Sequence, residues 1–292
     1  MKHYIINAFL LLAGAVCTQT TSAQKLNSSQ FMKTPESIIP FQQGFFITDL
    51  GEGGNPSAKD GNGIIWKMDK KGNGTAFATG LDAPKGTAIV AHTLYVADVD
   101  KIKGFDVSTG KQVFTLDFSA TGTVLLNDLT KKDDHTLFVS SSDINKIYTV
   151  HLDNGGSFEE LKLKEEVRGA NGLTYDPTSD RLYACGFGSL KTQDGLIGYI
   201  DLKKQPDTFV PLSDRKGFYD GLEMTANKKQ LVISDWVSFE KKGVLLLLDI
   251  ASGHITTVKA PLINGPADFV LVGNTAFVPA FLDADILRIP LQ

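Results

Sequence analysis

Short apolar runs alternate with polar turns along most of the chain, and they recur with a period in the forties. Each repeat begins at a polar position, which we call the slot, followed by an apolar run and a turn. A β-rich run starts nine to eleven residues after the slot, and a second β-rich run follows it. The six slot positions are Glu36, Lys85, Asn127, Asn171, Asp220 and Ala267.

Successive slots lie 42 to 49 residues apart, a spacing typical of the blades of a β-propeller. A four-stranded blade cannot bury both of its faces alone, so such blades stack around an axis. Six copies therefore predict an all-β fold, a six-bladed β-propeller with four-stranded blades. The β-rich runs that follow the slots are 45–49, 94–98, 137–140, 182–185, 231–235 and 276–279.

The last copy ends at Gln292, soon after its third predicted strand, and so lacks an outer strand. Residues 25–34 precede the first slot, and we expect them to supply that strand and close the ring. Closure in this way removes an open sheet edge. The helix alternative is weak, because only residues 157–167 are compatible with a helix, and they fall where an outer strand is expected.

Residues 1–23 have the pattern of a secretory signal, with Lys2 before a short apolar run and small residues up to Ala23. Lipidation at Cys17 is the alternative interpretation. We therefore expect a single mature domain over residues 24–292, periplasmic or secreted, without stable membrane insertion. Its one remaining cysteine, Cys185, lies in a strand-like run, which favours burial over reactivity.

The composition is that of a globular protein, with 42% hydrophobic and 21% charged residues. The formal net charge of -4 argues against the basic surface that nucleic-acid binding needs. The chain also lacks the phosphate-loop, zinc-protease and nucleophile-elbow motifs. These exclusions leave a small-molecule substrate as the expected partner, and the sequence leaves the oligomeric state open.

In a propeller, the first strand of each blade runs along the central channel, so the six slots are expected to meet at one mouth. Two carboxylates (Glu36, Asp220) and two amides (Asn127, Asn171) would then converge. Oxygen ligands with two negative charges suit a hard divalent cation, Ca²⁺ most naturally, with Zn²⁺, Mn²⁺ and Mg²⁺ as alternatives. The competing interpretation is local, because Asn and Asp often begin strands by bonding nearby backbone.

Four short motifs at the slots resemble the family of senescence marker protein, gluconolactonase and luciferin-regenerating enzyme, which is related more distantly to the paraoxonases. The resemblance implies a six-bladed propeller with a divalent metal in the channel. It also implies Glu36, Asn171 and Asp220 as main metal ligands and Asn127 as an auxiliary ligand. The motifs are Pro35-Glu36-Ser37, Leu126-Asn127-Asp128-Leu129, Asn171-Gly172-Leu173 and Tyr219-Asp220-Gly221-Leu222.

The chain also departs from that family. Sugar-lactonase members usually carry an Arg two residues before the third-blade Asn, where this chain has Leu125. The paraoxonase-type catalytic histidines have no clear counterpart, since His92 and His135 lie seven or eight residues after a slot. The resemblance therefore supports the fold and the metal better than it supports a sugar-acid substrate.

A cation at the channel mouth suits the hydrolysis of a lactone or ester, which also requires a base. The resemblance suggests Asp220 as that base, although a metal ligand is a weaker base, and Asp128 is the second candidate. Lys85 is expected either to hold an anionic group of the substrate or to lie at a solvated lip. Tyr219, with Phe218 and Trp236, is expected either to form an apolar wall or to pack between blades.

Two hypotheses follow. The first is a divalent-metal-dependent hydrolase of lactones or related esters, and the second is a non-catalytic propeller that binds a small ligand or protein. A fold does not fix a function, and propellers host both. The oxygen set at the slots favours the first hypothesis, whereas Leu125 and the absent histidines favour the second.

Overall fold

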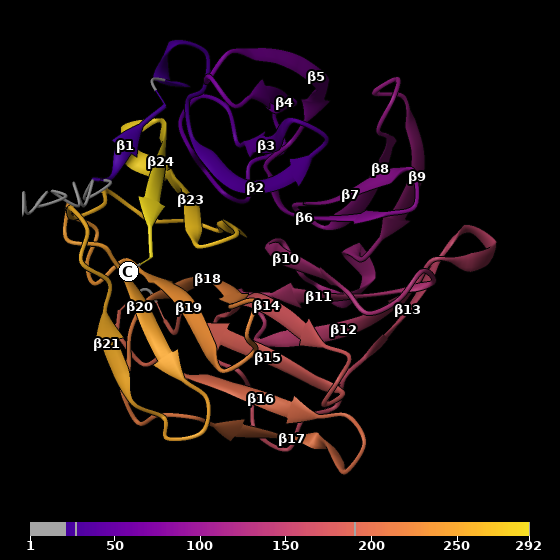
Figure 1. The fold of residues 1–292 in the computed structure, drawn as a ribbon. Helices are drawn as coiled ribbons and strands as arrows, with labels where there is room; N and C mark the ends of the chain where they lie inside the picture. The colour runs from indigo at the N-terminus through magenta and orange to yellow at the C-terminus, as the bar shows by residue number, and fades with distance from the viewer. Residues whose placement is uncertain (1–21, 27, 190, 292) are drawn as a thin grey trace, which may run out of the picture.

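The chain folds into a six-bladed β-propeller in a computed structural model that describes residues 22–26, 28–189 and 191–291. The predicted signal segment, including Cys17, lies almost entirely outside the described residues. Six four-stranded antiparallel sheets are arranged around a centre, with β2, β6, β10, β14 and β18 innermost (Figure 1). The predicted fold class is confirmed.

Each of the first five blades is built from four consecutive strands, joined by turns and short loops. The strands of blades 1 to 3 are β2 (Pro35–Phe41), β3 (Gly44–Asp49), β4 (Gly63–Asp69) and β5 (Gly74–Leu81); β6 (Pro84–Val90), β7 (Thr93–Asp98), β8 (Lys101–Asp106) and β9 (Gln112–Asp117); β10 (Leu126–Lys131), β11 (Thr136–Ser141), β12 (Lys146–His151) and β13 (Ser157–Glu160). Those of blades 4 and 5 are β14 (Ala170–Asp176), β15 (Arg181–Gly186), β16 (Ile197–Asp201) and β17 (Gln205–Pro211); β18 (Tyr219–Met224), β19 (Gln230–Asp235), β20 (Val244–Asp249) and β21 (Ile255–Thr257).

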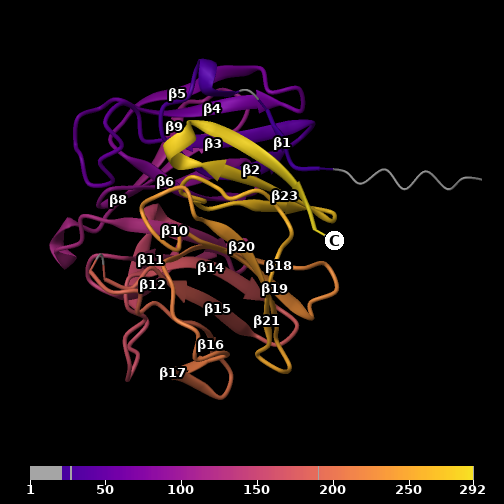
Figure 2. The same ribbon diagram turned by 90° about the vertical axis from the view of Figure 1, so that its left-hand side faces the viewer.

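The sixth blade joins the two ends of the described chain. Its strands are β22 (Val270–Val272), β23 (Thr275–Ala280), β24 (Asp285–Pro290) and β1 (Gln24–Lys25). Strand β1 pairs with β24, and both views place it beside the yellow C-terminal strands (Figures 1 and 2). The expected closure of the ring is confirmed, although only Gln24 and Lys25 pair instead of a strand within 25–34.

A buried polar pair fixes this closure. The backbone N–H and the Oγ of Ser28 each donate to Asp285 Oδ1 at 2.9 Å, and the N–H of Ile286 donates to Ser28 Oγ. Both side chains are almost fully buried, so these bonds hold the N-terminal segment against the last strand. The chain then bends into a short 3₁₀ turn at Ser28–Gln30, which ends the pairing.

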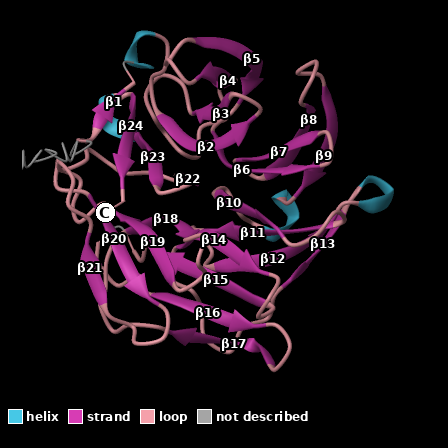
Figure 3. Ribbon diagram, in the orientation of Figure 1, coloured by secondary structure: helices cyan, strands magenta, loops and turns pink. Residues whose placement is uncertain are grey.

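The second strand of each blade is buried on both faces, because the neighbouring blades cover it. Strands β11 and β15 are therefore almost uniformly buried, whereas the outer strand β9 alternates and is largely exposed. Helical structure in the described residues is limited to short 3₁₀ turns, and none is long and apolar enough to cross a membrane (Figure 3). The stretch 157–167 contains strand β13, as the blade pattern requires.

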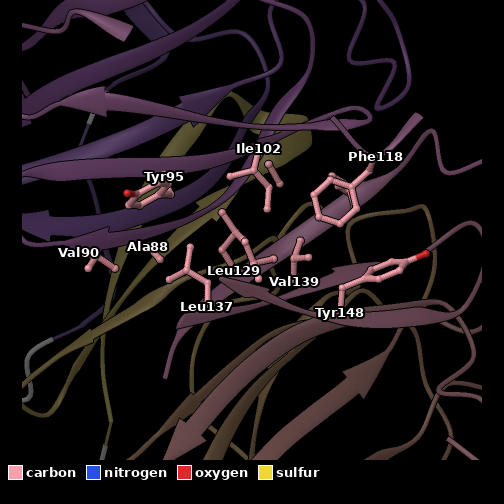
Figure 4. Packing of buried hydrophobic residues seen from close by; sticks show 12 residues of the cluster. Ala88, Val90, Tyr95, Ile102, Phe118, Leu129, Leu137, Val139 and Tyr148 are labelled. Carbon is pink, nitrogen blue, oxygen red and sulfur yellow. The ribbon is translucent and has the colours of Figure 1, made fainter. Parts of the chain in front are cut away.

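The core lies between adjacent blades. Figure 4 shows one such layer, in which Ala88, Tyr95 and Ile102 of blade 2 pack against Leu137 and Val139 of blade 3. Equivalent apolar layers join the other neighbouring blades. This packing gives the inner strands a rigid frame from which the slot side chains project.

Candidate metal centre at the channel mouth

The slot side chains project from irregularities in the inner strands. In each of blades 1 to 5, the pairing between the inner and second strands shifts register at the slot, as a β-bulge does. A bulge interrupts the alternation of side chains, so the slot residue turns toward one mouth of the channel. The sixth inner strand begins only at Val270 and carries no such shift, and its slot is the buried Ala267.

Hydroxyl side chains of the second strands hold three of these bulges. Thr48, Ser140 and Ser234 accept hydrogen bonds from the backbone N–H groups of Ser37, Asp128 and Gly221 respectively, at 2.7 to 3.0 Å. In blade 4, Cys185 takes the corresponding place, and its Sγ donates to the carbonyl of Asp220 at 3.2 Å. Cys185 is free and fully buried, which confirms the prediction that it is structural.

Five slot residues line one cavity of about 680 Å³ at this mouth, which we call the funnel: Glu36, Lys85, Asn127, Asn171 and Asp220. All five side chains are more than nine-tenths buried. The structure therefore brings together residues that are far apart in the sequence.

Within the described residues, only four buried side-chain nitrogen or oxygen atoms have no hydrogen-bond partner, and all four belong to this set. They are Glu36 Oε2, Asn127 Oδ1, Asn171 Oδ1 and Asp220 Oδ1. Leaving such an atom unpaired costs about 1–3 kcal/mol each, so four in one cavity form a set of oxygens able to receive a ligand. The described chain contains no group of three or more His, Cys, Asp and Glu side chains placed to hold a metal. A cation in this cavity would therefore need the two amide oxygens as well as the two carboxylates.

Neighbouring groups orient these oxygens. Trp236 Nε1 donates to Asp220 Oδ2 at 2.8 Å, which leaves Oδ1 as the unpartnered atom. Asn127 Nδ2 donates to Ser142 Oγ at 3.0 Å, which likewise leaves its Oδ1 unpartnered, and Ser142 in turn donates to the carbonyl of Ala170. The orientations of the Asp220 and Asn127 side chains are therefore fixed by residues that are not themselves slot residues.

Burial and mutual repulsion disfavour the charged forms of these groups. Burial raises the pKa of Glu36 well above its usual value, and the charge of Asp220 adds to this effect. Burial likewise raises the pKa of Asp220 to about 7. Burial lowers the pKa of Lys85 to about 8, although the charge of Glu36 opposes this shift. Lys85 Nζ donates to the carbonyl of Ala83 at 2.7 Å, at the bottom of the loop that precedes its strand.

Two predicted site residues are not brought to the funnel, and these expectations need correction. Both Asp128 oxygens accept backbone hydrogen bonds, from Leu129 and from Leu173 of the next blade, and its side chain lines a different cavity. Its neighbour Asn127 lines the funnel, so the two consecutive residues serve different cavities. Tyr219 is fully buried between blades, where its hydroxyl bonds to Arg215.

Trp236, expected either to form an apolar wall or to pack between blades, lines the funnel, whereas the sequence interpretation did not single out Phe239 or Phe281. Phe187, Trp236 and Phe281 each follow directly on the second strand of their blade, and all three line the cavity with Phe239. Leu50 and Ser142 occupy the same position in blades 1 and 3 and also line it. The signal was present, because in five of the six blades the residue after the second strand lines the funnel, and the repeat alignment could have revealed this.

Aspartates at the ends of second strands were also missed. Asp49 accepts from the N–H groups of Lys33 and Thr34, and Asp98 accepts from those of Asp82 and Ala83. Both aspartates are about 1% exposed. They fix the loops that lead into the slots, as Asp235 does through Phe218.

His92 and His135 do not line the funnel. They lie in the hairpins between β6 and β7 and between β10 and β11, and His135 is an exposed partner of Asp153 at 3.0 Å. The funnel thus contains no histidine among the residues that line it. The polar side chains that line it carry carboxylate, amide, ammonium, guanidinium, hydroxyl and indole groups.

The sequence matches no protein-family model, and no match was found among the curated proteins. Solved structures do resemble it in fold. A gluconolactonase from Xanthomonas campestris has a TM-score of 0.68 at 14% identity, covering 92% of this chain and 89% of that one. At these identities the likeness concerns the fold alone.

Two further neighbours have other roles. A catalytically inactive virginiamycin B lyase from Staphylococcus aureus, solved with quinupristin, has a TM-score of 0.61 at 15% identity and covers 93% and 99% of the two chains. A chain of a nidogen/laminin complex has a TM-score of 0.62 at 19% identity and covers 76% and 82%. The same propeller architecture thus occurs in enzymes and in a protein complex.

Proposed function

We propose that this protein is a divalent-cation-dependent hydrolase of lactones or related esters that acts in the periplasm or outside the cell. The observation that carries the proposal is the convergence of four unpartnered, buried oxygens on one cavity. The gluconolactonase neighbour agrees with it at the level of the fold.

The donor chemistry fits a hard cation. Glu36 and Asp220 supply two carboxylates, and Asn127 and Asn171 supply two neutral oxygens. Ca²⁺ accepts six to eight oxygen ligands, so the remaining positions are left for water or substrate. We expect Ca²⁺, with Zn²⁺, Mn²⁺ and Mg²⁺ as alternatives.

When bound, such a cation supplies a Lewis acid that polarises an ester carbonyl. The reaction adds water to the carbonyl carbon, breaks its bond to the ester oxygen and leaves a carboxylic acid and an alcohol. Asp220 is the candidate base for the proton of the attacking water, since Trp236 holds one of its oxygens and leaves the other facing the cavity. Lys85 is the candidate partner for negative charge on the substrate.

The second candidate function is ligand binding without catalysis. It is favoured by one observation, that the second predicted base, Asp128, lies away from the funnel and has both oxygens engaged. Asp220 is then required to act both as ligand and as base, which weakens it as a base. This alternative predicts a bound cation but no turnover.

Two measurements test the proposal. Elemental analysis and equilibrium dialysis of the purified protein with Ca²⁺ should give about one divalent ion per chain. A panel of lactones and esters should be hydrolysed with the ion present, and chelator should abolish the activity, which Ca²⁺ should restore. Hydrolysis that chelator leaves unchanged would contradict the cation dependence, whereas ion binding without hydrolysis of any panel member would favour the binding function.

A further inference from the structure

The funnel is chemically two-sided. Blades 4, 5 and 6 place Phe187, Trp236 and Phe281 at equivalent positions along one side, and Phe239 completes this aromatic wall. The rings contact one another, with centroids 5.7 to 6.1 Å apart from Phe187 through Trp236 to Phe239 and from Trp236 to Phe281. Such spacing is that of packed aromatic side chains, so the wall is a continuous apolar surface.

The wall is also open to solvent. Phe239 is 52% exposed and Leu282, beside Phe281, is 47% exposed, which is unusual for such large apolar side chains within a cavity. A concave apolar surface that stays exposed marks a binding site for an apolar group.

The aromatic wall directly adjoins the slot residues of the candidate metal centre. The indole of Trp236 belongs to the wall, and its Nε1 donates to Asp220 Oδ2 at 2.8 Å. A ligand whose carbonyl lies beside a cation that the unpartnered oxygens would hold therefore has its substituent near aromatic carbon.

The polar side of the funnel has few free groups. Asp143 already accepts from Thr123 and from the N–H of Val124, and Asn145 is bonded to Glu166 and Gly169. Arg168 is paired with Asp194 at 2.5 Å, and Ser142 bridges Asn127 and Ala170. Apart from the four unpartnered oxygens and Lys85, the polar side chains of the funnel are thus largely engaged. They replace few of the hydrogen bonds to water that a polyhydroxylated sugar lactone loses on entry.

We propose that the funnel selects lactones or esters with an apolar substituent, aromatic or bulky aliphatic, over polyhydroxylated sugar lactones. This inference rests on the proposed function for the words lactone and ester, but the apolar selectivity rests on the wall. The cavity volume of about 680 Å³ is sufficient for a ligand of drug size, much larger than a bare lactone ring.

Binding of unreactive lactams separates selectivity from catalysis. The probes are 6-phenyl-δ-valerolactam and D-gluconolactam, which share a six-membered lactam ring and differ in apolar against hydroxyl substituents. Isothermal titration calorimetry of the Ca²⁺-supplied protein should show the phenyl lactam binding at least about 10-fold more tightly, or about 1.4 kcal/mol. Phe239→Ala should weaken phenyl-lactam binding about 5- to 10-fold without unfolding, since the ring is half exposed.

Val113→Ala is the matched control, because Val113 is 55% exposed on the outer strand β9, away from the funnel, and should leave affinity unchanged. Gluconolactam binding as tightly as the phenyl lactam, or a Phe239→Ala variant with wild-type affinity, would overturn the inference. If the phenyl lactam binds as expected while neither parent lactone is hydrolysed, the proposed hydrolase function fails and the apolar selectivity of the site is supported.

Discussion

The two ends of the central channel both contain buried carboxylates, but they treat them differently. At the funnel, Glu36 and Asp220 each leave an oxygen without a partner. At the opposite cavity, of about 440 Å³, Asp128 and Asp268 are bonded to backbone N–H groups and to Ser37 Oγ. A buried carboxylate whose oxygens all have partners is therefore not a candidate ligand, whereas unpartnered oxygens in a shared cavity are.

Adjacent residues of the same inner segment serve the two different ends of the channel. Asn127 lines the funnel and its neighbour Asp128 lines the opposite cavity, and in blade 6 the slot Ala267 is followed by Asp268. In blade 3 the same short motif therefore supplies a candidate ligand to one end and a structural carboxylate to the other, whereas blade 6 supplies only the carboxylate.

The largest effect, on ion binding and hydrolysis, is expected from removing an unpartnered oxygen of the funnel. Asp220→Ala and Asn171→Ala should lose the bound divalent ion, because each removes an oxygen that no protein group replaces. Hydrolysis should fall about 100-fold or more, while circular dichroism shows an intact fold. Equilibrium dialysis with Ca²⁺ and initial rates on the best panel substrate measure the two losses.

Asp268→Asn is the control at the opposite end, since the amide oxygen can still accept the 2.6 Å hydrogen bond from Ser37. This variant should bind the ion as the wild type does. Retained Ca²⁺ in Asp220→Ala, or equal loss in Asp268→Asn, would remove the distinction between the two ends.

A smaller effect, on stability, is expected from Asp128→Ala. The change leaves the buried N–H groups of Leu129 and Leu173 unpaired and breaks a link between blades 3 and 4. The free energy of unfolding should fall by about 2–4 kcal/mol, measured by chemical denaturation. Ion binding by the variant that still folds should be unchanged, and a stability equal to that of the wild type would show that these bonds contribute little.

The smallest effect concerns pH. Burial, then the charge of Asp268, raises the pKa of Glu223 to about 8 in the opposite cavity. A carboxyl with a raised folded pKa contributes stability below its unfolded pKa of about 4.3, and this is lost as the pH rises toward 8. Glu223→Gln should therefore become more stable relative to the wild type between pH 5 and pH 8, by about 1 kcal/mol because the cavity admits water.

Asp176→Asn provides the opposite sign. Although burial alone raises its pKa, hydrogen bonds from Lys228 and Ser179 hold the pKa of Asp176 well below its usual value. Its contribution is present at neutral pH and is lost as the pH falls through the acid range. Denaturation curves of Glu223→Gln at pH 5, 7 and 8, and of Asp176→Asn from pH 5 down to about pH 2, each beside the wild type, check the two slopes. Slopes of the same sign would contradict the assigned shifts.

The fold was predictable because equivalent strands are buried to the same extent in each blade, which repeats the same apolar pattern along the sequence. Second strands such as β15 are covered on both faces, so they read as apolar runs at a fixed distance from the slot. The convergence of Glu36, Asn171 and Asp220 on one cavity followed from the same period, since equivalent strands place equivalent residues around an axis. Ring closure was predictable for a similar reason, because one blade lacked a strand.

The remaining features depend on geometry that the period does not encode. Asp128 lines the opposite cavity although Asn127 beside it lines the funnel. Nothing in the repeat pattern shows which of the two neighbouring polar residues faces the funnel. Tyr219 precedes Asp220 but points into the core, where Arg215 satisfies its hydroxyl. Phe239 comes from a loop after β19, and its place in the wall depends on the conformation of that loop.

The closure of the sixth blade has a consequence for biosynthesis. Residues 24 and 25 precede the first blade in the chain, whereas their partners on β24 follow the other five blades. Five blades can assemble as the chain emerges from the ribosome, but the final sheet and the Ser28–Asp285 contact must wait until β24 has been made. The ring is thus completed in a single late step that joins two segments separated by the rest of the propeller.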